Sequence, residues 1–125
     1  MSIQISIYSE IPIYEQIKDQ IRKAIISNQY KSNEMLPSIR TLSKELQVGI
    51  VTVKRAYDDL VIEGYIINQS AKGYYILPIN QKIIEKQYRG KIEDLFQKVS
   101  ALQDEANLSD ELVEKLWRQR KGVGK

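Results

Sequence analysis

Apolar residues recur along the first part of this chain at the spacing of an amphipathic helix. The stripe consists of Ile13, Ile17, Ile21 and Ile25, at intervals of four residues. Side chains at this spacing share one face of a helix, which can then pack against a core. Pro12 suits the first turn, where a missing N–H costs nothing. The pattern therefore predicts a first helix that begins near Pro12.

A second helix is predicted after Leu36, Pro37 and Ser38. The residue before a proline is disfavoured in α conformation, and a serine that follows can cap the free N–H groups of a first turn. The pattern separates an apolar inner face from a polar outer face: Ile39, Leu42 and Leu46 against Arg40, Ser43 and Lys44.

The stretch ELQVGIVTVKRAY, residues 45–57, holds the end of this helix and the beginning of another. The helical pattern stops at Gln47, Val48 and Gly49 and resumes at once, which predicts a tight turn between two packed helices. We expect Gly49 to be the N-cap of the third helix and Gly64 to end it. Its inward positions are predicted to be Val53, Ala56, Tyr57 and Leu60.

Strand-like runs complete the first region. Residues 65–69 and 74–77 flank the sequence SAKG, in which Gly73 stands where a hairpin turn needs positive φ. Residues 3–8, IQISIY, alternate apolar and polar positions and predict another short strand. Asn28 and Asn33 are expected to adopt left-handed backbone in the loop after the first helix. The order of elements predicts a mainly α fold with a small β wing, a winged helix-turn-helix over residues 1–78.

The pattern changes after Pro78. One long helix is predicted from Gln81 to about Glu105, with apolar residues at alternating spacings of four and three, which suits a partner helix. Ser109 is expected to cap a last short helix. We interpret residues 79–125 as a two-helix dimerisation tail, although packing of both helices on the first domain is an alternative. The predicted dimerisation residues are Ile84, Tyr88, Ile92, Leu95, Val99 and Leu102.

Composition excludes several functions. The 125 residues include no cysteine and no histidine, so thiol chemistry, disulfides and the usual metal ligand and neutral-pH base are absent. The acidic pairs Asp58-Asp59, Glu93-Asp94 and Asp104-Glu105 do not converge, because neighbours on a helix point about 100° apart. We interpret them as solvated faces. We predict no enzyme, no catalytic or metal site and no cofactor.

The chain start and the apolar runs bear on localisation. The first residues, MSIQISIYSE, lack the basic start and long apolar run of a signal peptide. No apolar run approaches the ~18 residues of a membrane span. We expect a cytoplasmic protein without a membrane partner.

The basic residues are clustered, although the net charge is only +3. Between Ser38 and Ala56 stand four basic residues and a single acidic one, Glu45. A duplex major groove admits a helix presented by its first turns, and a tight turn between packed helices provides that presentation. Hairpin residues can reach an adjacent minor groove or its phosphates. The candidate DNA contacts are Arg40, Ile50, Val51, Thr52, Lys54, Arg55, Ser70, Lys72 and Gly73.

The stretch LPSIRTLSKELQVGIVTVKRAYDDLVIEGYI, followed by SAKGYYI, resembles the DNA-binding domain of GntR-family bacterial transcription regulators. The resemblance runs from about Ile11 to Leu77, and the short helical tail resembles the YtrA-like branch. It implies a homodimer on a two-fold symmetric operator, usually a repressor. Four residues match positions that contact DNA in relatives: Arg40, Thr52, Lys54 and Gly73. Ile50 and Val51 correspond by position only, since relatives carry arginine or asparagine at the first of these.

A second function stays open on the residues alone. Exposed β-branched residues such as Ile50 and Val51 also suit a protein interface, so the alternative is a winged-helix protein interaction module without specific DNA binding. DNA binding should weaken steeply as salt rises, whereas an apolar protein interface should not. Neither the operator sequence nor a small-molecule effector is predicted, and a ligand pocket between tail and wing stays open.

Overall fold

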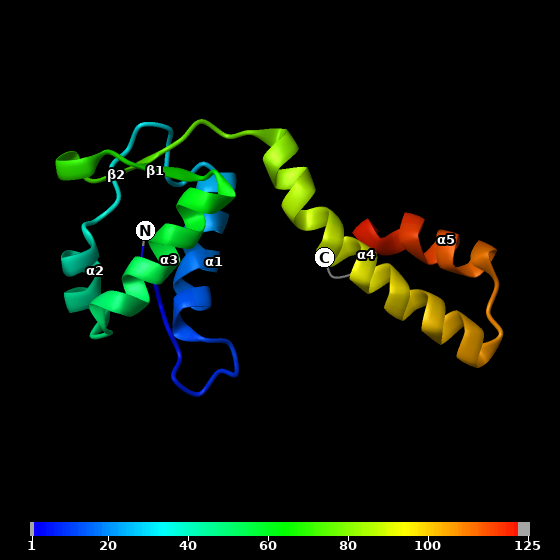
Figure 1. Cartoon of the computed structure of the whole chain (residues 1–125). Helices are drawn as coiled ribbons and strands as arrows, with labels where there is room; N and C mark the ends of the chain where they lie inside the picture. Colours follow the sequence, from blue (N-terminus) through cyan, green and yellow to red (C-terminus); the bar gives the residue numbers. More distant parts are fainter. Residues whose placement is uncertain (1, 123–125) are drawn as a thin grey trace. The chain divides into compact units, whose positions relative to one another are not determined.

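The computed structural model describes residues 2–122, and its elements follow the predicted order (Figure 1). Residues 1 and 123–125, the outer ends of the two predicted domains, lie outside the described residues. The helices and strands are α1 (Ile13–Ile26), α2 (Ile39–Leu46), α3 (Ile50–Glu63), β1 (Ile66–Asn68), β2 (Tyr74–Ile76), α4 (Gln81–Ala106) and α5 (Asp110–Gln119). Short 3-10 turns lie at Ser70–Lys72 and Arg120–Gly122. The mainly helical fold with a small antiparallel sheet is as predicted.

Contacts within the chain divide it into two compact units, with the division between Ile83 and Ile84. In the first unit α3 packs against both α1 and α2 (Figure 1). The predicted apolar stripes meet there, and their buried members are Ile17, Ile21 and Ile25 of α1 and Val53, Ala56, Tyr57 and Leu60 of α3. This unit has a hydrophobic core of its own.

An ion-pair network fastens α1 to α3 beside this core. The Lys18 ammonium lies 2.9 Å from Glu63 and 3.6 Å from Asp59, and Arg22 lies 3.4 Å from Glu63 and also pairs with Asp19. Burial lowers the pKa of Lys18, but the hydrogen bond and charge of Glu63 outweigh it and raise that pKa above its usual value. The interpretation of Asp58-Asp59 as a solvated pair is wrong for Asp59, because Lys18 of another helix reaches it.

A segment outside the two-stranded sheet pairs with β2, which the sequence did not predict. Strands β1 and β2 pair antiparallel, with Ile67 opposite Tyr75. On the other edge of β2, the Ile76 N–H donates to the Glu34 carbonyl at 2.8 Å and the Leu36 N–H donates to the Tyr74 carbonyl at 2.9 Å. Residues 33–36 thus tie the segment before α2 to the wing.

The predicted strand at residues 3–8 is wrong. Two glutamine side chains of α1 take the place of a neighbouring strand: Gln16 and Gln20 each both accept from and donate to backbone groups of this segment. The Gln4 N–H donates to Gln20 Oε1 at 2.9 Å, and the Ser6 N–H donates to Gln16 Oε1 at 2.8 Å. Side-chain amides carry both a donor and an acceptor, so they satisfy an extended backbone without a sheet.

Most predicted helix ends and turns are confirmed. Ser38 Oγ accepts from the Thr41 N–H at 3.1 Å, as expected of an N-cap. Asn28 and Asn33 adopt φ of 64° and 70°. Gly64 ends α3 with φ of 89°.

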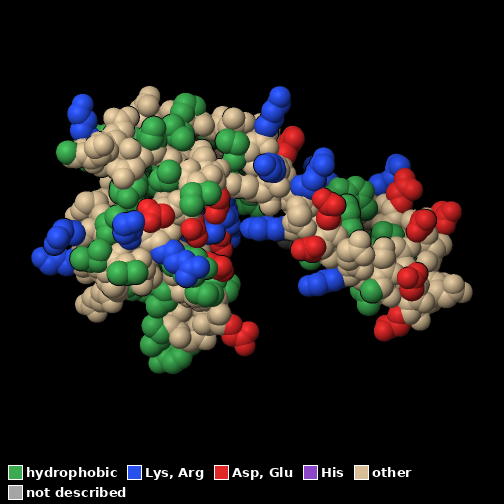
Figure 2. Space-filling view, in the orientation of Figure 1, with side chains coloured by type: hydrophobic (Ala, Val, Ile, Leu, Met, Phe, Trp, Pro, Cys, Tyr) green, Lys and Arg blue, Asp and Glu red, His purple; other side chains and the backbone are tan. Residues whose placement is uncertain are grey.

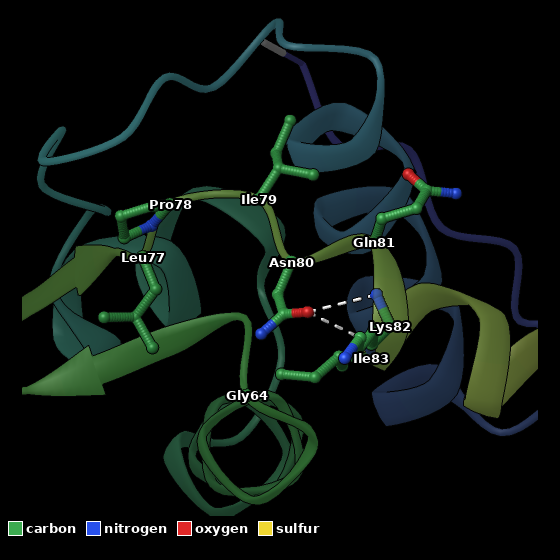
Figure 3. A pocket seen from close by; sticks show the side chains of 8 residues that line it. All are labelled: Gly64, Leu77, Pro78, Ile79, Asn80, Gln81, Lys82 and Ile83. Atoms are coloured by element: carbon green, nitrogen blue, oxygen red, sulfur yellow. Dashed lines mark hydrogen bonds between the residues drawn. The ribbon is translucent and has the colours of Figure 1, made fainter.

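Gly64 also lies against the side chain of Ile83, the last residue of the first unit. A Cβ at this position would lie 2.9 Å from Ile83 Cδ1. Asn80 holds the start of α4, because its Oδ1 accepts from the N–H groups of Lys82 and Ile83 at 3.0 and 3.4 Å (Figure 3). The shallow pocket of about 560 Å³ in Figure 3 lies within the first unit and is lined by Gly64 and residues 77–83.

The second unit consists of most of α4 together with α5. Ser109 caps α5, with its Oγ accepting from the Leu112 N–H at 3.1 Å. Gln103 of α4 links the helices by donating to Asp110 Oδ1 at 2.9 Å. An apolar groove of about 750 Å³ between α4 and α5 includes Val99 and Trp117 in its lining. Neither helix contains a buried residue.

Across residues 2–122, none of the helices combines the length and the apolar character needed to cross a bilayer.

Candidate nucleic-acid interface

The turn between α2 and α3 is held by Ser43. Gln47 adopts left-handed backbone, with φ of 56°. The N–H groups of Gln47 and Val48 both reach the Ser43 carbonyl, and the Ser43 hydroxyl donates back to the Val48 carbonyl. The expectation that Ser43 faces outward is wrong, because the residue is only 9% exposed. The sharp turn leaves the Val48 carbonyl in need of a hydrogen-bond donor, and the Ser43 hydroxyl turns inward to supply it. Ser43 therefore fixes the angle at which α3 is presented.

The first turn of α3 is open to solvent. Gly49 is its N-cap, as predicted, and contributes no capping side chain. Val51 is 80% exposed and Ile50 46% exposed, while Thr52 is half-buried. The end of a helix with free N–H groups and small side chains can enter a groove and approach an anion.

A second contact holds the body of α3 in place. Tyr57 is wholly buried, its hydroxyl donates to the Pro37 carbonyl at 2.7 Å, and its ring meets Tyr74 edge-on at 4.9 Å. Burial, and then the nearby Tyr30 and Tyr74, raise the pKa of Tyr57 well above its usual value, so it stays neutral and can donate. Sequence reasoning placed Tyr57 inward but missed this link between α3, the segment before α2, and β2.

The predicted basic contacts differ in their surroundings. Lys54 donates to Asp58 Oδ2 of the next turn at 2.6 Å, and this hydrogen bond together with the Asp58 charge raises the pKa of Lys54. The Arg55 guanidinium stacks over the Tyr14 ring, 3.7 Å from its centroid. Arg40 is exposed and has no ion-pair partner among residues 2–122.

Two further basic side chains resemble Arg40 in this respect. Lys44 on α2 and Lys72 at the hairpin tip are exposed, and neither forms an ion pair within the described part of the chain. Lys44 was not among the predicted contacts, although it stands one helical turn after Arg40. Figure 2 shows basic side chains at the edge of the first unit that carries α2, interspersed with apolar and uncharged ones.

The wing tip is a tight turn with two unusual backbone positions. Ser70 adopts φ of 49° and Gly73 φ of 111°, as the hairpin prediction requires for the glycine. The Gln69 N–H donates to the Gly73 carbonyl at 2.7 Å and closes the turn. Ser70 and Lys72 are exposed at its tip, which lies on the same side of Figure 1 as α2.

The six predicted dimerisation residues all lie on α4 in the second unit. Ile84, Tyr88 and Val99 are half-buried, and the other three are exposed: Ile92, Leu95 and Leu102. On α5, Leu116 and Trp117 are also exposed. The apolar surface is therefore wider than the predicted seam.

Residues 13–76 match the family described as bacterial regulatory proteins, gntR family. The chain belongs to the GntR family. Its members are transcription regulators, and the winged-helix fold is the one that the motifs predicted.

Known relatives agree with this membership. The chain is 38% identical over 74 residues to the HTH-type transcriptional repressor YtrA of Bacillus subtilis, a match that covers 59% of this chain and 57% of that protein. Matches to other curated regulators span still less of their length. YtrA of Sulfolobus acidocaldarius, a GntR-family transcription factor, is 34% identical with a TM-score of 0.68, covering 79% of this chain and 97% of that one.

A DNA-bound structure shares the fold. The AraR DNA-binding domain in complex with operator ORE1 has a TM-score of 0.52 at 21% identity, covering 61% of this chain and 93% of that one. At this identity the likeness concerns the fold alone.

Proposed function

We propose that this GntR-family regulator is a repressor that binds, as a homodimer, a two-fold symmetric operator in duplex DNA. The observation that supports DNA binding best is the end of the first unit on which exposed basic residues without acidic partners flank the open start of α3. Arg40 and Lys44 stand on one side of this start, on α2, and Lys72 stands on the wing.

Each predicted contact takes a role from its place on this surface. Ile50, Val51 and Thr52, in the first turn of α3, approach base edges: the two β-branched residues suit a thymine methyl, and the threonine hydroxyl suits a base or phosphate. Arg40 contacts backbone phosphate, as does Lys54 once it leaves Asp58.

Arg55 and the wing supply the remaining contacts. Arg55 lies over the Tyr14 ring, which keeps its guanidinium extended along the protein surface, and it contacts a phosphate beside the groove. The wing tip provides Ser70, Lys72 and the backbone of Gly73 for the adjacent minor groove or its phosphates. Gly73 allows the positive φ that brings this backbone to the surface.

Homodimer formation is supported by the apolar surface of the second unit. α4 and α5 bury no residue within the chain, yet α4 has a near-heptad stripe and α5 adds Leu116 and Trp117. Apolar surface of this extent marks a site for another protein. A second copy of the same two helices completes a four-helix arrangement, and two-fold symmetry of the protein then requires a two-fold symmetric operator.

Two further parts of the proposal, repression and a cytoplasmic location, are argued from similarity to known regulators. The repressor assignment rests on the name of the B. subtilis relative. A regulator that acts on bacterial DNA works in the cytoplasm.

The alternative function, a protein interaction module, is favoured by one observation. Ile50 and Val51 are exposed at the start of α3, where an apolar patch also suits a protein. Salt separates the two functions, because only DNA binding releases counterions from phosphates.

The experiment that tests the proposal is selection of bound fragments from the genome of the host organism, followed by a salt titration on the recovered duplex. We expect fragments that share an inverted repeat, and an affinity that falls steeply between about 50 and 200 mM salt. Recovery of no common sequence, or an affinity independent of salt, would contradict the proposal and favour the interaction module.

A further inference from the structure

The exposed face of α3 carries an ion pair that the DNA-binding role does not explain. Lys54 and Asp58 stand one helical turn apart, with the ammonium 2.6 Å from the carboxylate and both side chains about half exposed. The other carboxylates of this half of α3, Asp59 and Glu63, pair with Lys18 or Arg22 of α1 and so join two helices. The ion pair of Asp58 is instead with a residue of its own helix, in the direction of the DNA-binding surface.

Helix stability gives little reason for this pair. An exposed pair four residues apart contributes little, and this one has lysine N-terminal to aspartate, which is the less favourable order. Its effect on a nearby polyanion is larger. A lysine that remains paired with a carboxylate neutralises no phosphate and releases no counterion, so it adds nothing to the salt-dependent part of DNA affinity. Arg40, Lys44 and Lys72 form no such pair among residues 2–122.

We propose that Asp58 competes with DNA phosphate for Lys54 and thereby restrains sequence-independent DNA binding. This inference rests on the proposed function, because it requires that α3 faces DNA. The carboxylate of Asp58 lies next to Lys54 and so weakens binding to the many non-operator sequences that a regulator meets. It needs no contact with a base.

The test uses the 125-residue chain and a mixed-sequence duplex of about three helical turns, so the operator need not be known. Binding is measured by fluorescence anisotropy at several salt concentrations for the wild type, Asp58→Asn, Lys54→Ala and the double variant. Glu114→Gln is the matched control, because Arg118 and Glu114 form an equally spaced exposed pair at 2.7 Å on α5. It changes the net charge by the same amount. Circular dichroism confirms that each variant is folded.

For Asp58→Asn we expect the slope of log affinity against log salt to steepen by about 0.9 for each protomer that contacts the duplex. Each such protomer then makes binding roughly eightfold tighter than in the wild type at about 0.1 M salt. The gain should vanish when Lys54 is alanine, and Glu114→Gln should leave the slope unchanged. An unchanged slope for Asp58→Asn overturns the inference. So does an equal gain in the Lys54→Ala background, since Asp58 would then act as a general negative charge. A wild type that shows no salt-dependent binding overturns the proposed function, and this inference with it.

Discussion

The two units of this chain differ in how far their apolar residues are buried. In the first unit, Ile17, Ile21, Val53 and Leu60 are fully buried between α1 and α3. In the second, helices with equally regular apolar stripes leave Leu95 58% and Trp117 54% exposed. A stripe that finds a partner within the chain makes a core, whereas one that does not marks a surface for another molecule. The first unit therefore has a core in one copy, whereas for the second we propose that another copy covers the exposed stripe.

The largest effect is expected when the second unit is prevented from pairing. Replacing the exposed Leu95 and the half-buried Val99 with aspartate places two charges on the apolar stripe of α4, which should separate the proposed dimer. Loss of the second half-site contact then weakens operator binding by about 10²- to 10⁴-fold. Affinity measured by anisotropy on the selected duplex checks this.

The matched control puts the same charges on the opposite side of the helix. Gln97→Asp with Ala101→Asp has the same spacing on α4, at exposed positions outside the predicted seam. It should bind operator nearly as the wild type does. Equal loss in both double variants would contradict the dimer interface, since any two added charges would then suffice.

The next largest effect is on the free energy of unfolding, which should depend on protein concentration for a substitution in the second unit but not for one in the first. Leu60→Ala removes a fully buried side chain from the first unit and should lower the free energy of unfolding by about 2–5 kcal/mol, independently of protein concentration. Leu95→Ala should instead have an effect that depends on concentration, because its burial requires a second copy. Urea unfolding followed by circular dichroism at two protein concentrations distinguishes them. A Leu60→Ala cost below about 1 kcal/mol would show that the first unit is not the independent core described.

A smaller effect concerns Tyr57. Tyr57→Phe removes the hydrogen bond to the Pro37 carbonyl and should cost about 1 kcal/mol at neutral pH. Its raised pKa means that the folded state keeps a proton which the unfolded chain loses near pH 10, so its contribution is present below that pH and lost as pH rises further.

The pH dependence is measurable by unfolding at pH 8 and above 10. The wild type should lose stability across this range, and Tyr57→Phe should lose less. Some loss should remain in the variant, because the pKa values of Tyr30 and Lys18 are also raised. Identical pH profiles would contradict the role of the buried hydroxyl.

The smallest effect tests one phosphate contact on the first unit. Arg40→Ala should reduce the slope of log affinity against log salt by about 0.9 per protomer, with similar losses on all sequences. Lys98→Ala, an exposed lysine on α4, serves as the control and should leave the slope unchanged. If the two variants behave alike, Arg40 is not a specific part of the DNA surface.

Sequence reasoning succeeded where local backbone chemistry decides the structure. The helices follow from their apolar spacing, and Ser38, Asn28, Asn33 and Gly64 mark caps and turns because few residue types fit those conformations. It failed where a segment finds a partner far away in the chain. Neither the pairing of residues 33–36 with β2 nor the glutamine contacts of residues 4–6 leave a periodic signal.

For the candidate site, the sequence proposes the contact residues, and their surroundings could be predicted only in part. The four-residue spacing of Lys54 and Asp58 is visible in the sequence and indicates a pair. The stacking of Arg55 on Tyr14 is not, because it depends on how α1 and α3 pack. Ser43 was predicted on the wrong face, because helical periodicity does not register the hydrogen bond that its hydroxyl donates to the Val48 carbonyl in the following turn.

The most direct test of the contrast between the two units is sedimentation equilibrium of the wild type and the Leu95→Asp, Val99→Asp variant over a range of concentrations. We expect the wild type at twice the 14.5 kDa mass of the chain. The variant should sediment as a monomer whose first unit still unfolds cooperatively. A wild type that stays monomeric at micromolar concentration, or a variant that stays dimeric, would contradict the central claim that a second copy completes the second unit.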